Sequence, residues 1–134
     1  MRIPLLSLLL LCIAAVANPA RAELHITRDH GGYVEEYKAR YKRVREKGER
    51  VIIDGICNSA CTLVLSVVPG ERICVTKRAV LGFHAARSVD RRGRFYAEPE
   101  ASDAVLQAYP GPVRDWISRR GGLSSRLLLL KGRE

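Results

Sequence analysis

The sequence predicts an α/β domain built on a small, mainly parallel sheet with flanking helices. Between residues 24 and 83, segments with the pattern of strands alternate with segments of helical period. This alternation is typical of strand–helix–strand units, whose strands lie parallel in one sheet. The chain has 134 residues, 47% of them hydrophobic, which fits one globular domain and excludes a disordered chain.

The first 22 residues have the composition of a secretory signal peptide. Arg2 gives a positive start, residues 5–17 are apolar except for one serine, and the Ala-Arg-Ala triplet at 20–22 fits a cleavage site. The alternative is an uncleaved anchor, but the apolar run is short for a membrane span. We therefore expect a single domain over residues 23–134, periplasmic or secreted.

Periodicity predicts the first strand and helix. Residues 24–27 alternate apolar and polar side chains as in a half-buried strand, and a turn follows over 29–32. A helix is expected over 33–47, and Gly48 suits the position just after its end. Helical spacing places four large side chains on one face, namely Tyr33, Tyr37, Tyr41 and Val44.

The next segment repeats the strand and helix pattern. The β-branched run 51–53 is typical of a buried strand, and a turn is expected over 54–58. A largely apolar helix is expected over 60–68, because a Pro-Gly pair follows and ends it. Two more strands are expected at 72–76 and 79–83.

The pattern weakens after residue 84. A charged loop is expected over 88–94, and helices over 101–109 and 113–120. Pro112 suits the first turn of the second helix, where its missing N–H is not needed. The apolar run 127–130 is too short to cross a membrane.

Three features point to one candidate catalytic site. Gly31 and Gly32 follow the first strand, so their N–H groups are open to an oxyanion. Ser59 lies at a strand-to-helix turn, where a helix start stabilises negative charge, and the small Ala60 leaves room for substrate. His84 follows the strand 79–83. The carboxyl ends of parallel strands share one sheet edge, so we expect these residues to meet there.

Each feature also has a purely structural interpretation. A Gly-Gly pair is usually a tight turn, a serine before a helix is often a cap, and a histidine at a strand end is often a backbone hydrogen-bonding partner. Together they are more specific, because acyl transfer requires a nucleophile, a base and an oxyanion-binding loop.

Residues 24–86 resemble the core of the Clp protease proteolytic subunit, within the ClpP/crotonase fold. LHITRDHGGYVEEY is similar to that family's strand, oxyanion loop and helix start. GICNSACTLVLSVVPGERICV resembles its nucleophile turn, helix and next strand, and AVLGFHA resembles the strand ending in its catalytic histidine. The separation of 25 residues between Ser59 and His84 is close to the family's spacing. The C-x-S-A-C-T pattern looks most like exported bacterial members.

The resemblance implies a serine hydrolase acting on a peptide or an ester. It makes Ser59 the nucleophile, His84 the general base, and the backbone N–H groups of Gly32 and Ala60 the oxyanion donors. Gly31 would shape the loop, and no cofactor is implied.

Parts of the family pattern are missing, so the expected domain is truncated at both ends. The family has another strand–helix unit before the glycine strand, and an aspartate well beyond the histidine. Nothing in their context singles out one of the available aspartates as the third carboxylate: Asp90, Asp103 and Asp115. Without one, His84 would act in a dyad with a less well fixed tautomer. The alternative hypothesis is therefore a catalytically inactive ClpP-like protein that binds a peptide or envelope partner.

Three cysteines fall in the expected domain, and at most one disulfide can join two of them. Pairing of Cys57 with Cys61, or of either with Cys74, is favoured by export to an oxidising compartment. A small buried or a reactive Cys61 are the alternatives. The spacing does not match a zinc site, so no metal is expected.

The domain is basic. The chain carries a net charge of +9, and two basic residues lie in the first 22, which leaves +7. Many arginines fall in the second half: Arg87, Arg91, Arg92, Arg94, Arg114, Arg119, Arg120 and Arg126. Such a surface attracts anionic lipid head groups or acidic substrates, or is simply a solvated face. The sequence has no nucleic-acid-binding motif, so no nucleic-acid partner is expected. The oligomeric state stays open.

Overall fold

The computed structural model describes residues 21–134, so nearly all of the expected signal segment lies outside the described residues. None of the helices in the described part is long and apolar enough to cross a membrane. The elements in chain order are β1 (Glu23–Asp29), α1 (Val34–Glu46), β2 (Arg50–Asn58), the 3-10 turn η1 (Ser59–Leu63), α2 (Val64–Val67), the 3-10 turn η2 (Gly70–Arg72), β3 (Ile73–Val75), β4 (Val80–Phe83), β5 (Arg87–Val89), β6 (Phe95–Ala97), α3 (Pro99–Ala108), α4 (Gly111–Ser118) and β7 (Leu128–Lys131).

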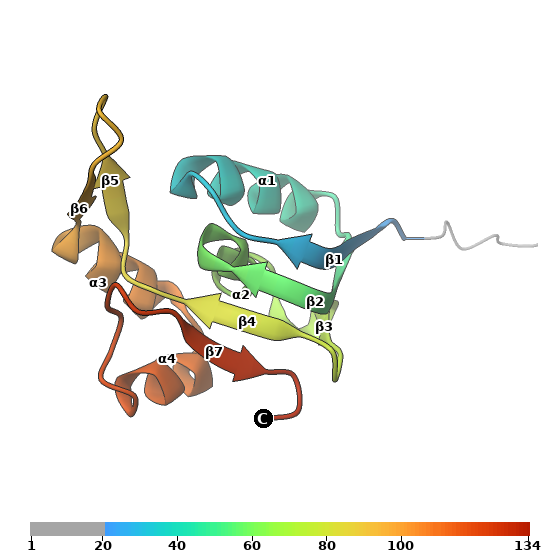
Figure 1. Ribbon diagram of the computed structural model, residues 1–134. Coiled ribbons are helices and arrows are strands. Elements are labelled where there is room, and N and C mark those ends of the chain that lie inside the picture. Colours follow the sequence, from blue (N-terminus) through green and yellow to red (C-terminus); the bar gives the residue numbers. More distant parts are fainter. Residues whose placement is uncertain (1–20) are drawn as a thin grey trace, which may run out of the picture.

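The main sheet is mostly parallel, as the sequence predicted. Its strand order is β1-β2-β4-β7, and all its pairings are parallel except that of β4 with β7 (Figure 1). The central strand β2 pairs on one side with β1. On its other side it pairs first with β3 and then with β4. Because β1, β2 and β4 run in the same direction, the segments that follow them emerge at the same edge of the sheet.

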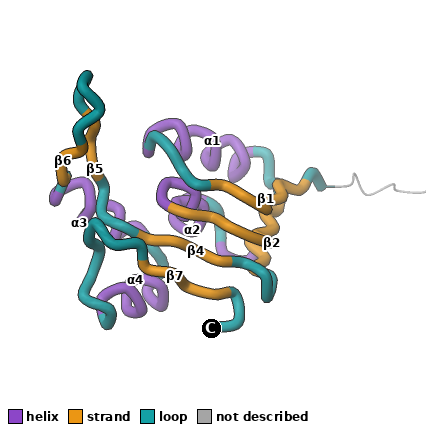
Figure 2. The backbone as a smooth tube through the Cα atoms, in the orientation of Figure 1, coloured by secondary structure: helices purple, strands orange, loops and turns teal. Residues whose placement is uncertain are grey.

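The core lies between this sheet and the helices. Tyr41 of α1, Ile53 of β2 and Phe83 of β4 are almost fully buried. Phe83 packs edge-on against Tyr109, with ring centroids 5.3 Å apart, and its centroid is 6.0 Å from that of Trp116 in α4. Aromatic contacts therefore anchor the end of α3 and the side of α4 on the last parallel strand, β4. Figure 2 shows the path of the chain from β4 through these two helices to β7.

Residues 54–58 do not form the predicted turn but continue β2 to Asn58. Gly55 reads as a turn residue, yet here it permits a close approach between strands: a Cβ at this position would overlap the carbonyl of Thr27. The pairing of β1 with β2 shifts register at this point. The glycine therefore marks an irregularity inside the strand, not its end.

Residues 60–68 are not one apolar helix, as the sequence suggested. They form the 3-10 turn η1 followed by the single helical turn α2. In η1, the Thr62 hydroxyl donates to the Ser59 carbonyl at 2.7 Å, and a disulfide joins Cys57 to Cys61. The hydrogen bond and the disulfide both hold the chain in a compact turn just after β2.

The predicted charged loop 88–94 is the end of a β-hairpin, formed by β5 and β6. Its turn is organised by Asp90, whose carboxylate accepts hydrogen bonds from the backbone N–H groups of Arg92 and Arg94. The short strand β7 had no counterpart in the sequence-based expectations. The two predicted helices are present as α3 and α4, each beginning two residues earlier than expected.

Candidate active site

Ser59 lies where β2 ends and η1 begins, with an unusual backbone conformation. Its φ of 57° makes it the one non-glycine residue with positive φ in the described part of the chain. Asn58 just before it is extended, so the chain turns sharply at the serine. A non-glycine residue in this region costs about 1–3 kcal/mol and persists only where its surroundings enforce it.

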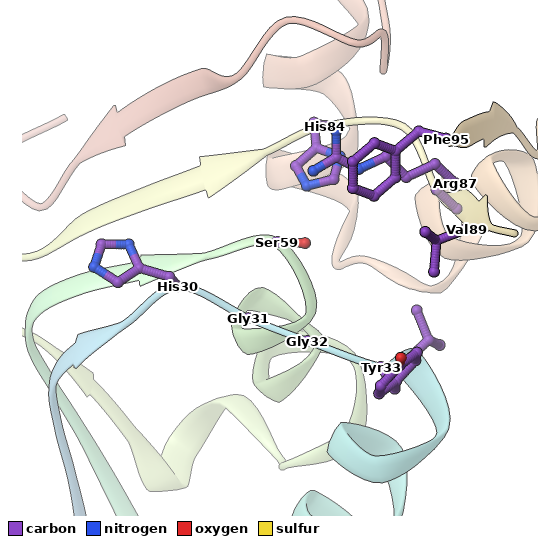
Figure 3. Close-up of a pocket in the computed structure, with 11 residues that line it drawn as sticks. His30, Gly31, Gly32, Tyr33, Ser59, His84, Arg87, Val89 and Phe95 are labelled. Atoms are coloured by element: carbon purple, nitrogen blue, oxygen red, sulfur yellow. The ribbon is translucent and has the colours of Figure 1, made fainter. Parts of the chain in front are cut away.

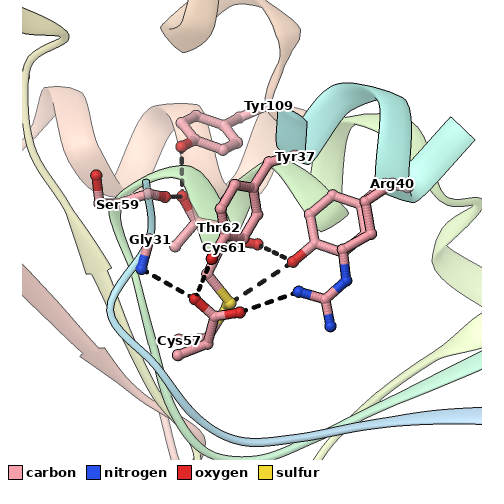
Figure 4. The surroundings of a disulfide bond; sticks show 10 residues. Gly31, Tyr37, Arg40, Cys57, Ser59, Cys61, Thr62 and Tyr109 are labelled. Carbon is pink, nitrogen blue, oxygen red and sulfur yellow. Dashed lines mark hydrogen bonds and ion pairs between the residues drawn. A yellow bond between two sulfur atoms is a disulfide. The ribbon is translucent and has the colours of Figure 1, made fainter. Parts of the chain in front are cut away.

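A disulfide encloses this turn. Cys57 and Cys61 are bonded across Ser59, with Cα atoms 5.3 Å apart, and both are fully buried (Figure 4). The carbonyl of Cys61 also accepts a hydrogen bond of 2.9 Å from the Tyr41 hydroxyl of α1. One of the predicted pairings is thus confirmed, and Cys74 is free and exposed.

A chain of buried hydroxyl groups holds the serine from a second direction. Thr62 donates to the Ser59 carbonyl, and its Oγ1 lies 2.6 Å from the Tyr109 hydroxyl oxygen. Since Thr62 uses its proton on Ser59, Tyr109 donates to Thr62. Burial raises the pKa of Tyr109 to about 12. Sequence reasoning missed both residues, because Thr62 and Tyr109 are 47 positions apart and no local pattern links them.

The glycine loop packs directly against this turn. Gly31 has a φ of 84°, and a Cβ on it would lie 2.7 Å from the Asn58 carbonyl oxygen and from Ser59 Cβ, and 2.8 Å from the Ala60 nitrogen. Glycine is required here for its conformation and for the close approach. The Gly31 N–H donates to Asp29 at 2.9 Å. It is therefore not available to an oxyanion.

Asp29 ties the loop to α1. Besides the Gly31 N–H, its carboxylate accepts hydrogen bonds from the Tyr37 hydroxyl at 2.5 Å and from Arg40 at 3.2 Å. Burial, and then the hydrogen bond to Asp29, raise the pKa of Tyr37 to about 12. The loop before α1 is thus fixed by a charged network, which leaves Gly32 as its candidate oxyanion donor. Ala60, near the start of η1, has no intrahelical acceptor for its N–H either.

His84 follows β4 and is half-buried. Its Nδ1 lies 2.6 Å from the Ala85 carbonyl oxygen. A hydrogen bond there places the ring proton on Nδ1 and leaves the Nε2 lone pair free to accept a proton. No ion pair or hydrogen bond in the described part of the chain joins His84 to a carboxylate, and Asp90 is engaged in the hairpin turn. A backbone carbonyl thus occupies the place expected for the third carboxylate.

Ser59, His84 and the two glycines line one cleft of about 350 Å³ (Figure 3). Ala60 lines a smaller cavity that shares Ser59 and His84 with the cleft. Among residues 21–134, no hydrogen bond from the Ser59 hydroxyl is present, so the serine and histidine share a cavity without being bonded to each other. No cluster of three His, Cys, Asp or Glu side chains suited to a metal ion occurs in the described part of the chain.

Comparison with known protein families found no family model that matches this chain, and comparison with curated proteins found no match.

Proposed function

We propose that this protein is a serine hydrolase, acting on a peptide or an ester, with the ClpP/crotonase fold that its sequence resembles. One observation carries the proposal: the strained turn at the end of a central parallel strand places Ser59 in a cleft with His84 and a glycine loop. A strained turn after a strand is a recurrent way of exposing a nucleophilic serine. The Cys57–Cys61 disulfide also fits our proposal that the protein is exported.

In the proposed reaction, Ser59 Oγ attacks the substrate carbonyl carbon while its proton passes to His84 Nε2. The N–H groups of Gly32 and Ala60 stabilise the oxyanion of the tetrahedral intermediate. His84 then protonates the leaving amine or alcohol, and an acyl-serine remains. Water attacks this ester and gives a proton to Nε2, which passes it to Ser59 Oγ as the acid is released and the free serine is restored.

The Ala85 carbonyl supports this assignment of roles. An aspartate in a triad holds the imidazole in one tautomer and stabilises its positive charge. The carbonyl at 2.6 Å supplies the first of these effects but only a weaker form of the second. We therefore expect slow turnover with activated esters and slower turnover with amides.

Covalent labelling tests the proposal. The oxidised protein is treated with a neutral fluorophosphonate, and adducts are detected by intact mass. We expect a single adduct that is lost in Ser59→Ala and strongly reduced in His84→Ala. Ser118→Ala is a matched control, because Ser118 is exposed on α4 and lines none of the cavities around Ser59. It should be labelled like the wild type.

The second candidate function is binding without turnover, to a peptide or an envelope partner. It is favoured by the missing hydrogen bond between Ser59 and His84, and by the missing carboxylate beside His84, in residues 21–134. Failure of the folded wild-type protein to form any adduct would exclude the hydrolase and leave this alternative. Catalytic hydrogen bonds are often long in apo enzymes and tighten when substrate binds, so the open Ser59–His84 geometry is also compatible with a hydrolase.

A further inference from the structure

We infer that the cleft selects acyl substrates that carry a carboxylate close to the scissile bond, and that Arg87 binds this carboxylate. The inference rests on the proposed hydrolase function and adds the chemical class of its substrate. It is carried by the charge of the cleft, by the unpaired state of Arg87, and by the position of Arg87 relative to Ser59.

The cleft around Ser59 contains basic side chains but no acidic ones. Its ionisable groups, apart from a tyrosine hydroxyl, are His30, His84 and Arg87, and none of the side chains that line it is acidic. A permanent positive charge at the edge of such a cleft raises the local concentration of anions and opposes cationic substrates.

Arg87 has no carboxylate partner within residues 21–134, unlike several other arginines of the fold. Arg40 pairs with Asp29, Arg78 with Asp54, and Arg94 with Asp90. The guanidinium of Arg87 lies instead over the Phe95 ring, 4.1 Å from its centroid. Stacking occupies the face of the guanidinium and leaves the N–H groups at its edge free. These are the groups that bind a carboxylate in a bidentate manner.

The hairpin holds this side chain at the mouth of the cleft. Val89 of β5 is paired with Phe95 of β6, so Arg87 and Phe95 are diagonal neighbours on adjacent strands. Phe95 is 62% exposed and lines the cleft together with Arg87. An exposed aromatic ring that holds an arginine side chain in place reduces the conformational entropy that this side chain loses when it binds a ligand.

Arg87 and Ser59 line the same two cavities. Both line the cleft of about 350 Å³, and both line an adjoining cavity of about 230 Å³ together with His84. A ligand that occupies these two cavities with its carbonyl at Ser59 therefore has Arg87 in the same lining. This shared lining favours a substrate whose carboxylate lies close to the scissile carbonyl.

A matched pair of esters tests the inference. p-Nitrophenyl monoadipate carries a free carboxylate on its acyl chain, whereas its methyl ester is neutral and nearly the same size. We expect the oxidised wild-type protein to hydrolyse the anionic ester with the higher kcat/KM, and Arg87→Gln to reduce the ratio of the two kcat/KM values about tenfold. Any loss of folded protein lowers both rates equally and leaves this ratio unchanged.

Arg91→Gln is the control, since it removes the same charge from the exposed tip of the same hairpin, away from the cleft. The control should keep the wild-type ratio. Equal ratios in the wild type and Arg87→Gln, or an equal drop in Arg91→Gln, would overturn the role of Arg87.

A binding measurement separates this inference from the proposed function. If neither ester is hydrolysed faster than by Ser59→Ala, the hydrolase proposal fails. Monomethyl adipate is then titrated into isotope-labelled protein. The amide signals of Gly32 and Ser59 should shift as the ligand binds. An affinity from these shifts that is about tenfold lower in Arg87→Gln would still support carboxylate recognition. An absence of shifts in the wild-type protein would refute it.

Discussion

At the level of single residues, the cleft depends on how closely Gly31 approaches the Ser59 turn. Gly31→Ala adds a Cβ within 2.8 Å of three atoms of that turn and also forces a left-handed conformation on alanine. The conformation alone costs about 1–2 kcal/mol. We expect a larger loss of unfolding free energy than this, measured by urea denaturation, together with slower fluorophosphonate labelling.

Gly93→Ala is the matched control for Gly31→Ala. Gly93 has a similar φ of 77° in the hairpin turn, but a Cβ there meets nothing within 4 Å. It should show the conformational cost without the collision, and no change in labelling. Equal losses for the two variants would show that the close packing against Ser59 contributes nothing.

Some residues of the candidate site could be predicted from the sequence and others could not. Gly31, Ser59 and His84 belong to short motifs that follow strands, so their convergence could be anticipated from the expected parallel sheet. Thr62 and Tyr109 could not, because their contact joins distant segments. Neither could Arg87, whose significance comes from the lack of an ion pair to a carboxylate within residues 21–134 and not from its neighbours in sequence.

At the level of elements, the disulfide stabilises the junction of β2 and η1. It closes a loop of only a few residues, since its cysteines are four positions apart. Loop-closure entropy for such a loop gives about 2 kcal/mol. We expect the double variant Cys57→Ala/Cys61→Ala to lose at least this much unfolding free energy, because both side chains are also buried, and to be labelled more slowly at Ser59.

Cys74→Ala is the control for the double variant, since Cys74 is free and exposed. Its urea midpoint should match that of the wild type. A reductant should lower the midpoint of the wild type and of Cys74→Ala, but not that of the double variant. An unchanged midpoint for the double variant would contradict a stabilising role for the disulfide.

The elements also differ in how well periodicity predicts them. Helices α1, α3 and α4 were predicted to within a few residues, because each has an apolar face of helical period or a proline near its start. The full length of β2 was hidden by Gly55, whose role is set by the neighbouring strand. β7 was missed because its short apolar run becomes a strand only by pairing with β4.

At the scale of the whole molecule, three buried or half-buried tyrosines attach the helices to the candidate site. Tyr37 binds Asp29 before α1, Tyr41 binds the Cys61 carbonyl, and Tyr109 binds Thr62 from the end of α3. Burial is the main cause that raises the pKa of each above its ordinary value of 10. The native protein therefore keeps these protons at a pH where the unfolded chain has released them.

This difference predicts a loss of stability at alkaline pH. The contribution of Tyr109 is fully present below pH 10 and is lost as the pH rises toward about 12, its pKa in the folded protein. A shift of this size corresponds to about 2–3 kcal/mol. We expect the free energy of unfolding, measured by urea denaturation across this pH range, to fall less steeply for Tyr109→Phe than for the wild type. The variant is less stable at neutral pH, because it lacks the hydrogen bond to Thr62.

Tyr33→Phe is the control, since it alters a ring that is 68% exposed and should keep the wild-type slope. The three proteins share all their lysines, so equal slopes would mean that Tyr109 ionises as readily in the native fold as in the unfolded chain, and that the hydroxyl chain behind Ser59 is open to water.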